Sequence, residues 1–284
     1  MCLPKDSVRT LHEAGYLTVK LGHESWDSVR AAFAAADLFF TSSIAVKNCN
    51  RLPEDFGYRP IGVEYSQSPD RPDLAESFSV SIRTRKACEL LQSLVAKTLY
   101  YRMLAVTEIL EPIAVNLTMG LAEFLGGGSL VHHLPRAFRH WSRLQMNYSQ
   151  PAKISAPLIN DLHEDRDLIT ITCATGPGLQ VQVGNGEFKS VTTAPGELLI
   201  LPGEIAWLLS GGYVQPLWHR VITCPKQPVR KSLLFFGDID PSLCEPWVRN
   251  EINSGVDIPG RVKASVTHFG LEGFDLSEGG LNDS

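Results

Sequence analysis

Two histidines and one aspartate have the residue types and the spacing of a metal-binding set. His163 and Asp165 lie two residues apart, and His219 follows later in the chain. Two imidazoles and one carboxylate form the facial ligand set that holds non-haem iron(II) and leaves positions open on the metal. Those open positions can take dioxygen and a second small molecule. The three residues therefore predict an iron centre that carries out oxidation chemistry.

Arg230 and Ser232 form a second pair with the same spacing. In an extended segment, residues two apart project to the same face, so each pair can act on one ligand from one strand. His163 and Asp165 would chelate one ion in this way. A guanidinium fork beside a hydroxyl suits a carboxylate, which arginine often binds through two parallel hydrogen bonds. We therefore expect a carboxylate-binding pair close to the metal site.

Short strands are expected to position these residues, because the second half of the chain alternates short apolar segments with turns. The expected strands cover 144–148, 168–173, 179–183, 188–191, 197–201, 206–209, 219–223 and 232–236. The run Gly184-Asn185-Gly186 predicts a hairpin turn between two of these strands. Many short strands at regular spacing are typical of a jelly roll or a barrel.

Helices are expected in the first half of the chain. Apolar residues recur at three- and four-residue steps over 26–40, and residues 87–125 have a mostly helical pattern with a break near Pro112. Residues 51–72, which are rich in Pro and Gly, are expected to form a polar loop. The predicted fold class is therefore α+β, with a jelly-roll core and the N-terminal helices packed on one of its faces.

The chain has no low-complexity linker or internal repeat, so we expect one domain over residues 1–284. Its expected parts are a helical N-terminal part (1–142), a jelly-roll core with the iron site (143–240) and a C-terminal extension (241–284). Hydrophobic residues make up 44% and charged residues 20% of the chain, as in an ordinary globular protein.

Charge and cysteine usage narrow the expected partners and the compartment. The net charge of −5 disfavours a general role in binding nucleic acid. We expect no membrane-spanning segment, because no apolar run approaches the roughly eighteen residues that crossing a bilayer requires. The six cysteines are scattered without a CxxC pair, which predicts reduced thiols and a cytoplasmic protein.

Several segments resemble the isopenicillin N synthase-like family of Fe(II)/2-oxoglutarate-dependent dioxygenases. The similar segments, which span most of the chain, are Gly15-Tyr16-Leu17-Thr18-Val19, Phe39-Phe40 with Lys47, Gly57-Tyr58 with Gly62 and Glu64, Asp73-Leu74-Ala75-Glu76-Ser77-Phe78, Met146-Asn147-Tyr148, Gly178-Leu179-Gln180-Val181 and His219-Arg220-Val221. One departure is Ser149, which stands where many members have a second tyrosine.

The resemblance implies a fold, a set of cofactors and roles for particular residues. It implies a double-stranded β-helix core, with Fe(II) bound by His163, Asp165 and His219. It also implies 2-oxoglutarate held by Arg230 and Ser232, dioxygen as the oxidant, and ascorbate as a reductant in vitro. Asn147 matches a position that often lies near the co-substrate.

Three further residues are candidates for binding a small-molecule substrate. Arg83 and Arg85 lie two apart after the Asp73–Phe78 segment, and they would share a face if that segment were extended. Tyr148 follows Asn147. A cationic pair in a pocket favours a substrate that bears a carboxylate. By contrast, a local basic cluster predicts a solvated helix face; its members are Arg136, Arg139, His140 and Arg143.

The predicted function is oxidation of an unactivated C–H bond of a small molecule, by hydroxylation, desaturation or cyclisation, in specialised metabolism. The Arg230 and Ser232 pair favours a reaction that uses 2-oxoglutarate. Two alternatives stay open on the residues alone: an oxidase of the same fold that uses no 2-oxoglutarate, and a catalytically silent jelly-roll protein that binds a ligand.

Overall fold

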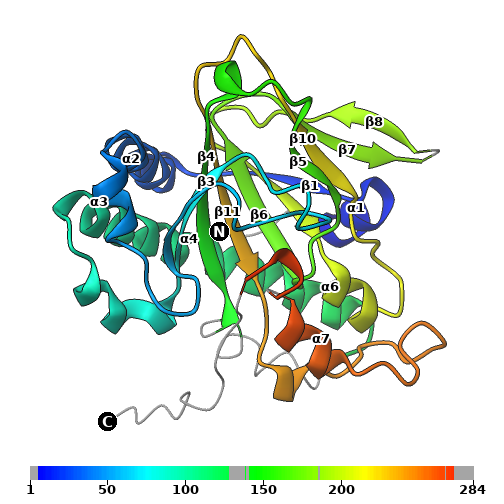
Figure 1. Cartoon of the computed structure of the whole chain (residues 1–284). Coiled ribbons are helices and arrows are strands. Elements are labelled where there is room, and N and C mark those ends of the chain that lie inside the picture. Colours follow the sequence, from blue (N-terminus) through cyan, green and yellow to red (C-terminus); the bar gives the residue numbers. More distant parts are fainter. Residues whose placement is uncertain (1–5, 128–137, 139–140, 185, 266, 272–284) are drawn as a thin grey trace.

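The chain forms two antiparallel β-sheets with helices packed beside the larger one, as the computed structural model in Figure 1 shows. The structure describes residues 6–127, 138, 141–184, 186–265 and 267–271. The strands are β1 (Leu17–Lys20), β2 (Gly57–Arg59), β3 (Glu76–Val80), β4 (Arg143–Ser149), β5 (Leu158–His163), β6 (Ile169–Ala174), β7 (Leu179–Val183), β8 (Glu187–Ser190), β9 (Glu197–Pro202), β10 (His219–Ile222) and β11 (Arg230–Gly237). The described α-helices are α1 (Ser7–Ala14), α2 (His23–Phe40), α3 (Ile44–Asn48), α4 (Leu94–Phe124), α6 (Glu204–Leu209) and α7 (Ile258–Ala264).

The two sheets have the strand orders of a jelly-roll core. The larger sheet runs β1-β9-β6-β11-β4-β3-β2, and the smaller one runs β5-β10-β7-β8. Short 3₁₀ helices connect some of these elements; they are η1 (Ile82–Leu90), η2 (Pro151–Lys153), η3 (Pro241–Leu243) and η4 (Thr267–Phe269). The predicted α+β class with a jelly-roll core and helices on one face is confirmed.

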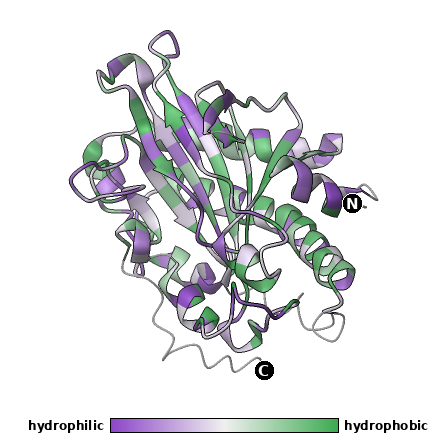
Figure 2. Ribbon diagram, turned by 90° about the vertical axis from the view of Figure 1, so that its right-hand side faces the viewer, coloured by the Kyte–Doolittle hydropathy of each residue, from purple (hydrophilic) through white to green (hydrophobic). Residues whose placement is uncertain are grey.

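Alternation along the central strands separates the core from a cavity. On β11, Leu233 and Phe235 are buried in the main apolar core, whereas Leu234 and Phe236 line a pocket on the other face. Successive side chains of a strand point to opposite faces, so one strand serves both purposes. Figure 2 shows the resulting alternation of hydrophobic and hydrophilic residues along the strands.

Helix α4 is the longest helix and packs against α2 and against strands of the larger sheet. Ser93 caps its N-terminus, because the Ser93 Oγ accepts a hydrogen bond from the Ala96 N–H at 3.2 Å. The predicted break near Pro112 is wrong, since Pro112 lies inside one continuous helix. Proline cannot donate a backbone hydrogen bond, so one bond of the helix is missing there. The buried side chains on both sides of Pro112, such as Leu110 and Ile113, pack against the fold and keep the helix continuous.

The same helix qualifies the expectation about membranes. By length and composition α4 could cross a bilayer, with a mean hydropathy of 1.3 in its most apolar window. In the structure, however, 56% of that window is buried inside the fold. A core helix of a globular protein has the same composition, and the packing of α4 against the sheet is that of a core helix.

Other expected elements also need correction. Residues 206–209 lie in the helix α6, not in a strand; a short apolar run alone does not distinguish the two. Strand β5 was not among the expected strands, although the spacing of His163 and Asp165 already implies an extended segment at His163. Arg83 and Arg85 lie in the 3₁₀ helix η1 and not in an extended segment, because Ser81 forms a capping box with Thr84 at its start.

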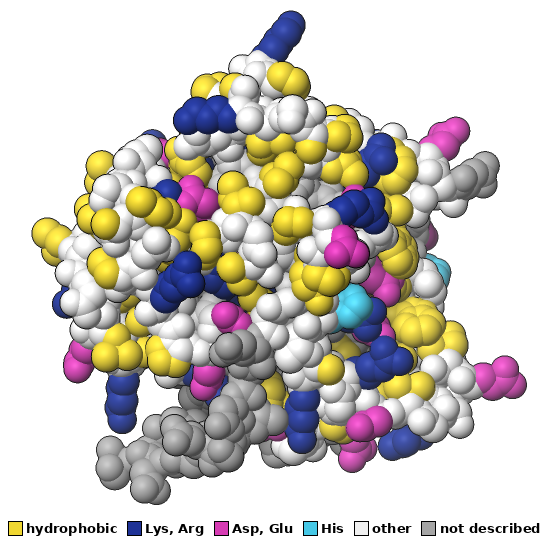
Figure 3. Space-filling view, in the orientation of Figure 1, with side chains coloured by type: hydrophobic (Ala, Val, Ile, Leu, Met, Phe, Trp, Pro, Cys, Tyr) yellow, Lys and Arg dark blue, Asp and Glu magenta, His cyan; other side chains and the backbone are white. Residues whose placement is uncertain are grey.

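The prediction that Arg143 belongs to a solvated helix face is wrong, because Arg143 lies on β4 and is only 8% exposed. Arg136, Arg139 and His140 lie outside the described residues. On the face drawn in Figure 3, basic and acidic side chains are interspersed among apolar ones. The predicted hairpin after β7 is present, because β7 pairs with β8 in register from Gln180 with Ser190 to Val183 with Glu187.

Candidate metal centre and adjoining pocket

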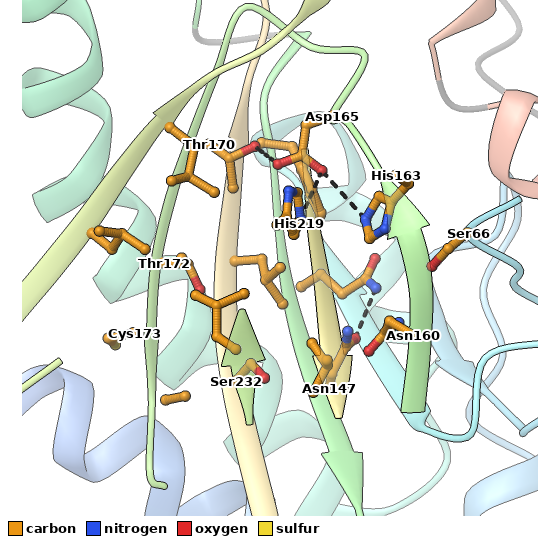
Figure 4. Close-up of a pocket in the computed structure, with 18 of the residues that line it drawn as sticks. Ser66, Asn147, Asn160, His163, Asp165, Thr170, Thr172, Cys173, His219 and Ser232 are labelled. Atoms are coloured by element: carbon orange, nitrogen blue, oxygen red, sulfur yellow. Dashed lines mark hydrogen bonds and ion pairs between the residues drawn. The ribbon is translucent and has the colours of Figure 1, made fainter. Parts of the chain in front are cut away.

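The three predicted metal ligands converge at one end of the pocket. His163 ends β5 and His219 begins β10, and these residues face each other across the smaller sheet. Asp165 follows β5 by two residues. Each imidazole Nε2 lies 3.8 Å from the Asp165 Oδ1, and one ligand atom from each residue lies within 4.8 Å of the others. Figure 4 shows the three side chains pointing toward one another.

Hydrogen bonds from the backbone orient both imidazoles. The His163 Nδ1 lies 2.7 Å from the Asp161 carbonyl oxygen, and the His219 Nδ1 lies 2.8 Å from that of Leu217. Each Nδ1–H therefore donates outward and leaves the Nε2 lone pair directed at the centre. Burial, together with the neighbouring His219 imidazole, lowers the pKa of His163 to about 4, which favours the neutral form that binds metals.

Asp165 is held in place by a neighbouring hydroxyl and by the start of α6. The Thr170 Oγ1 donates to the Asp165 Oδ2 at 2.6 Å, which leaves Oδ1 facing the imidazoles. The Glu204 N–H donates to the Asp165 carbonyl oxygen at 2.9 Å. Gly203 packs directly behind: a Cβ there would lie 2.1 Å from the Asp167 carbonyl oxygen. The backbone that carries the Asp165 carboxylate is therefore packed tightly against Gly203 and cannot shift toward it.

These residues fit a ferrous ion. Two neutral imidazole nitrogens and one carboxylate oxygen are the ligand types that such an ion takes from a facial triad. All three side chains line the pocket from one side, so the remaining coordination positions would face its interior. Asp165 and His219 are buried. Among the described residues, no further acidic or histidine side chain belongs to this cluster of ligand atoms within 4.8 Å of one another.

Arg230 and Ser232 lie on one face of β11, as predicted, and both line the pocket. The Arg230 guanidinium donates to the Ser232 hydroxyl, and its Nε donates to the Pro177 carbonyl oxygen at 3.0 Å. No described carboxylate lies within 4.0 Å of it. Burial lowers the pKa of Arg230 to about 10, so the group stays charged at neutral pH. A buried, oriented guanidinium without an acidic partner is suited to an anionic ligand.

Asn147 and Tyr148 lie on opposite faces of β4. Asn147 is opposite Ser232 and lines the pocket, where its Oδ1 accepts a hydrogen bond from the Gln145 Nε2 at 2.8 Å. Tyr148 is buried on the other face, and its ring stacks on that of Phe40 with the centroids 4.9 Å apart. The predicted substrate contact of Tyr148 therefore needs correction, because neighbours on a strand point in opposite directions.

Arg83 and Arg85 do not reach the pocket either. Arg83 lies 3.8 Å from the Glu54 carboxylate and over the Trp141 ring, and Arg85 is exposed. Neither side chain is among the residues that line the pocket. The prediction relied on an extended segment, and the 3₁₀ helix that forms there removes the shared face.

Polar residues for which the sequence predicted no role in the site form one wall of the pocket. Glu64 accepts from the Arg59 Nε at 2.7 Å and from the Gln145 Nε2 at 2.9 Å. Burial alone would raise the pKa of Glu64. The Arg59 guanidinium and a hydrogen bond from Ser77 outweigh this effect and lower the pKa below its ordinary value. Gln145 could have been found from its place two residues before Asn147 on the same strand face.

Asp73 and Asn160 extend this polar wall. Asp73 accepts hydrogen bonds from the Ser66 N–H at 3.1 Å and from its hydroxyl at 2.8 Å. Burial raises the pKa of Asp73 from 3.8 to about 6. Figure 4 places Ser66 and Asn160 on the same side of the pocket as Asn147. Glu64 and Asp73 lie in loops without a periodic pattern, so only their place in the segments of the family resemblance marked them.

Comparison with protein families supports the chemistry that this geometry suggests. Residues 141–238 match the model of the 2OG-Fe(II) oxygenase superfamily. This stretch contains the three metal ligands and the Arg230 and Ser232 pair. The match confirms the resemblance at the level of the superfamily, whose cofactors are Fe(II), 2-oxoglutarate and dioxygen, and it supports a dioxygenase. The isopenicillin N synthase-like subfamily stays a prediction. No curated relative matches the chain by sequence.

Solved structures show that the fold is shared. A full-length protein of Neurospora crassa, crystallised in complex with α-KG and thymine, superposes with a TM-score of 0.70 at 19% identity over 92% of this chain and 90% of that one. The dioxygenase for auxin oxidation of rice has a TM-score of 0.63 at 21% identity, over 82% and 77%. JOX2 in complex with 2OG, Fe and JA has a TM-score of 0.62 at 17% identity, over 83% and 71%.

Proposed function

We propose that this chain, whose residues 141–238 match the 2OG-Fe(II) oxygenase superfamily, oxidises a C–H bond of a small organic molecule. One observation carries the proposal: the His163, Asp165 and His219 cluster opens into the pocket that also contains the buried guanidinium of Arg230, which has no acidic partner among the described residues. When bound, Fe(II) and 2-oxoglutarate supply the reductive activation of dioxygen, which is coupled to oxidative decarboxylation of the 2-oxo acid.

The residues of the chain perform the binding and the positioning. His163, Asp165 and His219 would hold the metal from one side of the pocket. Arg230 and Ser232 would bind the remote carboxylate of 2-oxoglutarate through charge-assisted hydrogen bonds, with Asn147 beside it. This orientation would direct the 2-oxo acid from β11 toward the metal, and it would leave the rest of the pocket for the substrate.

Apolar side chains would exclude water from the reacting end. Leu234 and Phe236 on β11 and Phe269 in η4 line the pocket, and the Phe269 ring contacts that of His163 edge-on at 5.9 Å between centroids. Fold relatives in complex with thymine and with JA support a small organic substrate. Hydroxylation, desaturation or cyclisation in specialised metabolism is the class of outcome that we propose.

Succinate formation tests the proposal. Anaerobic protein mixed with Fe(II) and 2-oxoglutarate should develop a weak visible absorption band, and admission of air with ascorbate should produce succinate slowly even without substrate. Heat-inactivated protein with the same additions is the control for metal-catalysed oxidation in solution.

Each rival has its own signature in the same experiment. An oxidase that uses no 2-oxoglutarate would consume dioxygen with its substrate but form no succinate. A silent binding protein would show neither the absorption band nor turnover. Either result would contradict the proposed function.

A further inference from the structure

Arg143 is a second buried arginine of the same pocket, and it lacks an acidic partner among the described residues. It is 8% exposed, and no described carboxylate oxygen lies within 4.0 Å of its nitrogens. Its Nε has no hydrogen-bond partner. The guanidinium lies over the ring of Phe236, 4.6 Å from the centroid, and both residues line the pocket. Burial lowers the pKa of Arg143 to about 10, so the group stays charged at neutral pH.

The acidic groups whose charges raise the pKa of Arg143 are Glu64, Asp167 and Asp165, and each of them already accepts a hydrogen bond from another side chain. Glu64 pairs with Arg59 at 2.7 Å, which balances its charge. The Asp167 oxygens accept from the Thr170 hydroxyl at 3.2 and 3.1 Å. Burial raises the pKa of Asp238 well above its ordinary value, which favours its uncharged form. No described carboxylate forms an ion pair with Arg143, so acidic groups balance its charge only at longer range, and a buried charge without a direct partner is costly.

The position of Arg143 is that of a substrate contact. Arg143 lies opposite Phe236 on β11, Phe236 lies opposite Thr170 on β6, and the Thr170 hydroxyl donates to Asp165. Two strand spacings, about 10 Å, thus separate the backbone of Arg143 from the strand that supports the metal ligand. Arg230 lies six residues from Phe236 along β11, a distance of roughly 20 Å at the rise of an extended chain.

We propose that Arg143 binds the carboxylate of the substrate, and that the substrate is a small organic acid. The inference rests on the proposed function, because it names the substrate class of that same site. A guanidinium fork matches a carboxylate, and the Phe236 and Phe269 rings flank the space that an apolar body of the substrate would fill. The short span from Arg143 to the metal ligands suits a molecule of amino-acid or aryl-acid size.

A matched pair of ligands tests the charge requirement on the unaltered protein. Phenylacetate and phenylacetamide have nearly the same shape and differ in charge. Each is titrated by calorimetry into the anaerobic complex of the protein with Fe(II) and saturating 2-oxoglutarate, which keeps Arg230 occupied. We expect the acid to bind at least about tenfold more tightly than the amide. Equal affinity, or binding of neither, overturns the inference.

Substitution of Arg143 then assigns the effect to this residue. In Arg143→Met, which keeps the unbranched stem, phenylacetate should bind about ten- to a hundredfold more weakly, with the affinity for 2-oxoglutarate unchanged. Arg85→Gln, on the exposed face of η1, is the control and should match the wild type. Unchanged phenylacetate affinity in Arg143→Met contradicts the assignment. If that variant does not fold, Arg143→Lys, which keeps the charge without the fork, should still bind phenylacetate more weakly than the wild type. Wild-type affinity for phenylacetate in Arg143→Lys would contradict the proposal.

The same titrations separate this inference from the proposed function. The visible absorption band on adding 2-oxoglutarate reports the co-substrate site and does not depend on Arg143. Loss of that band in the wild type would contradict the proposed function. A normal band without a preference for the acid would contradict the role of Arg143 alone.

Discussion

The two sheets divide the work of the pocket between them. The smaller sheet supplies the imidazoles of His163 and His219, whereas the larger sheet supplies the guanidinium groups of Arg230 and Arg143. The larger sheet is backed by α2 and α4 and contains the main apolar core; the smaller one has only a limited apolar cluster around Val181. The better-packed sheet thus carries the groups that recognise anions, and the metal ligands depend on local hydrogen bonds for their orientation.

This division predicts that substitutions on the two sheets affect different ligands. Metal-side changes should abolish metal binding and turnover together. Changes at Arg230 or Arg143 on the larger sheet should leave the metal in place and weaken the binding of one anion. If a change at Arg230 or Arg143 released the metal, the two sheets would not have separate roles.

The largest effect is expected at the metal ligands. Asp165→Ala and His219→Ala should each lose Fe(II) and succinate formation, by more than the roughly 10–100-fold typical of losing an outer partner of a metal ligand. Thr170→Val, which removes only the hydrogen bond to Asp165, is the matched control and should fall within that range. Metal content after gel filtration and the rate of succinate release measure both. Full turnover in Asp165→Ala would show that the metal assignment is wrong.

A smaller effect is expected at Arg230 on the larger sheet. Arg230→Leu removes charge-assisted hydrogen bonds worth about 1.5–3 kcal/mol, so the KM for 2-oxoglutarate should rise about ten- to a hundredfold. The affinity for Fe(II) should not change, because the hydrogen-bond partners of Arg230 are Ser232 and Pro177 and not a metal ligand. Ser232→Ala should have a weaker effect in the same direction. A normal KM in Arg230→Leu would favour the oxidase that uses no 2-oxoglutarate.

An effect on stability, and not on ligand binding, is expected at the seam between the sheets, where Asp73 contacts Asn160 of β5. Because burial raises the pKa of Asp73 to about 6, its protonated form stabilises the fold below pH 4, and this contribution is lost as the pH rises through 6. Asp73→Asn stays neutral, so it should gain up to about 3 kcal/mol relative to the wild type between pH 4 and pH 8. Urea unfolding at both pH values measures the gain. A difference in unfolding free energy between Asp73→Asn and the wild type that is the same at pH 4 and pH 8 would contradict the prediction.

The reactive centre could be predicted from the sequence because strand geometry fixes it. The spacing of His163 and Asp165, and of Arg230 and Ser232, places each pair on one face wherever the chain is extended. The same alternation also places Tyr148 on the face opposite Asn147, away from the pocket. The role of Arg143 could not be read in this way, because the expected strand begins at Leu144 and the basic cluster predicts a helix at Arg143.

Errors in the predicted elements have a similar cause. Pro112 normally ends or bends a helix, but packing of α4 against the sheet keeps the helix continuous. The apolar run over 206–209 is compatible with either a strand or a buried helix, and the backbone of the Asp165 loop selects the helix by accepting its first N–H groups. Loop residues such as Glu64 reach the pocket through tertiary contacts that leave no periodic signal.

Gly203 constrains how the enzyme can diversify. Any larger residue there would press on the backbone carbonyl oxygens of Asp167 and Asp165, so substitution at this position would shift the metal ligand itself. Arg143 and Gln145 on β4 are not held against the metal ligands in this way. A directed-evolution library for new substrates should therefore randomise these two positions and keep Gly203 and Asn147 fixed, so that specificity varies while the oxidising centre stays unchanged.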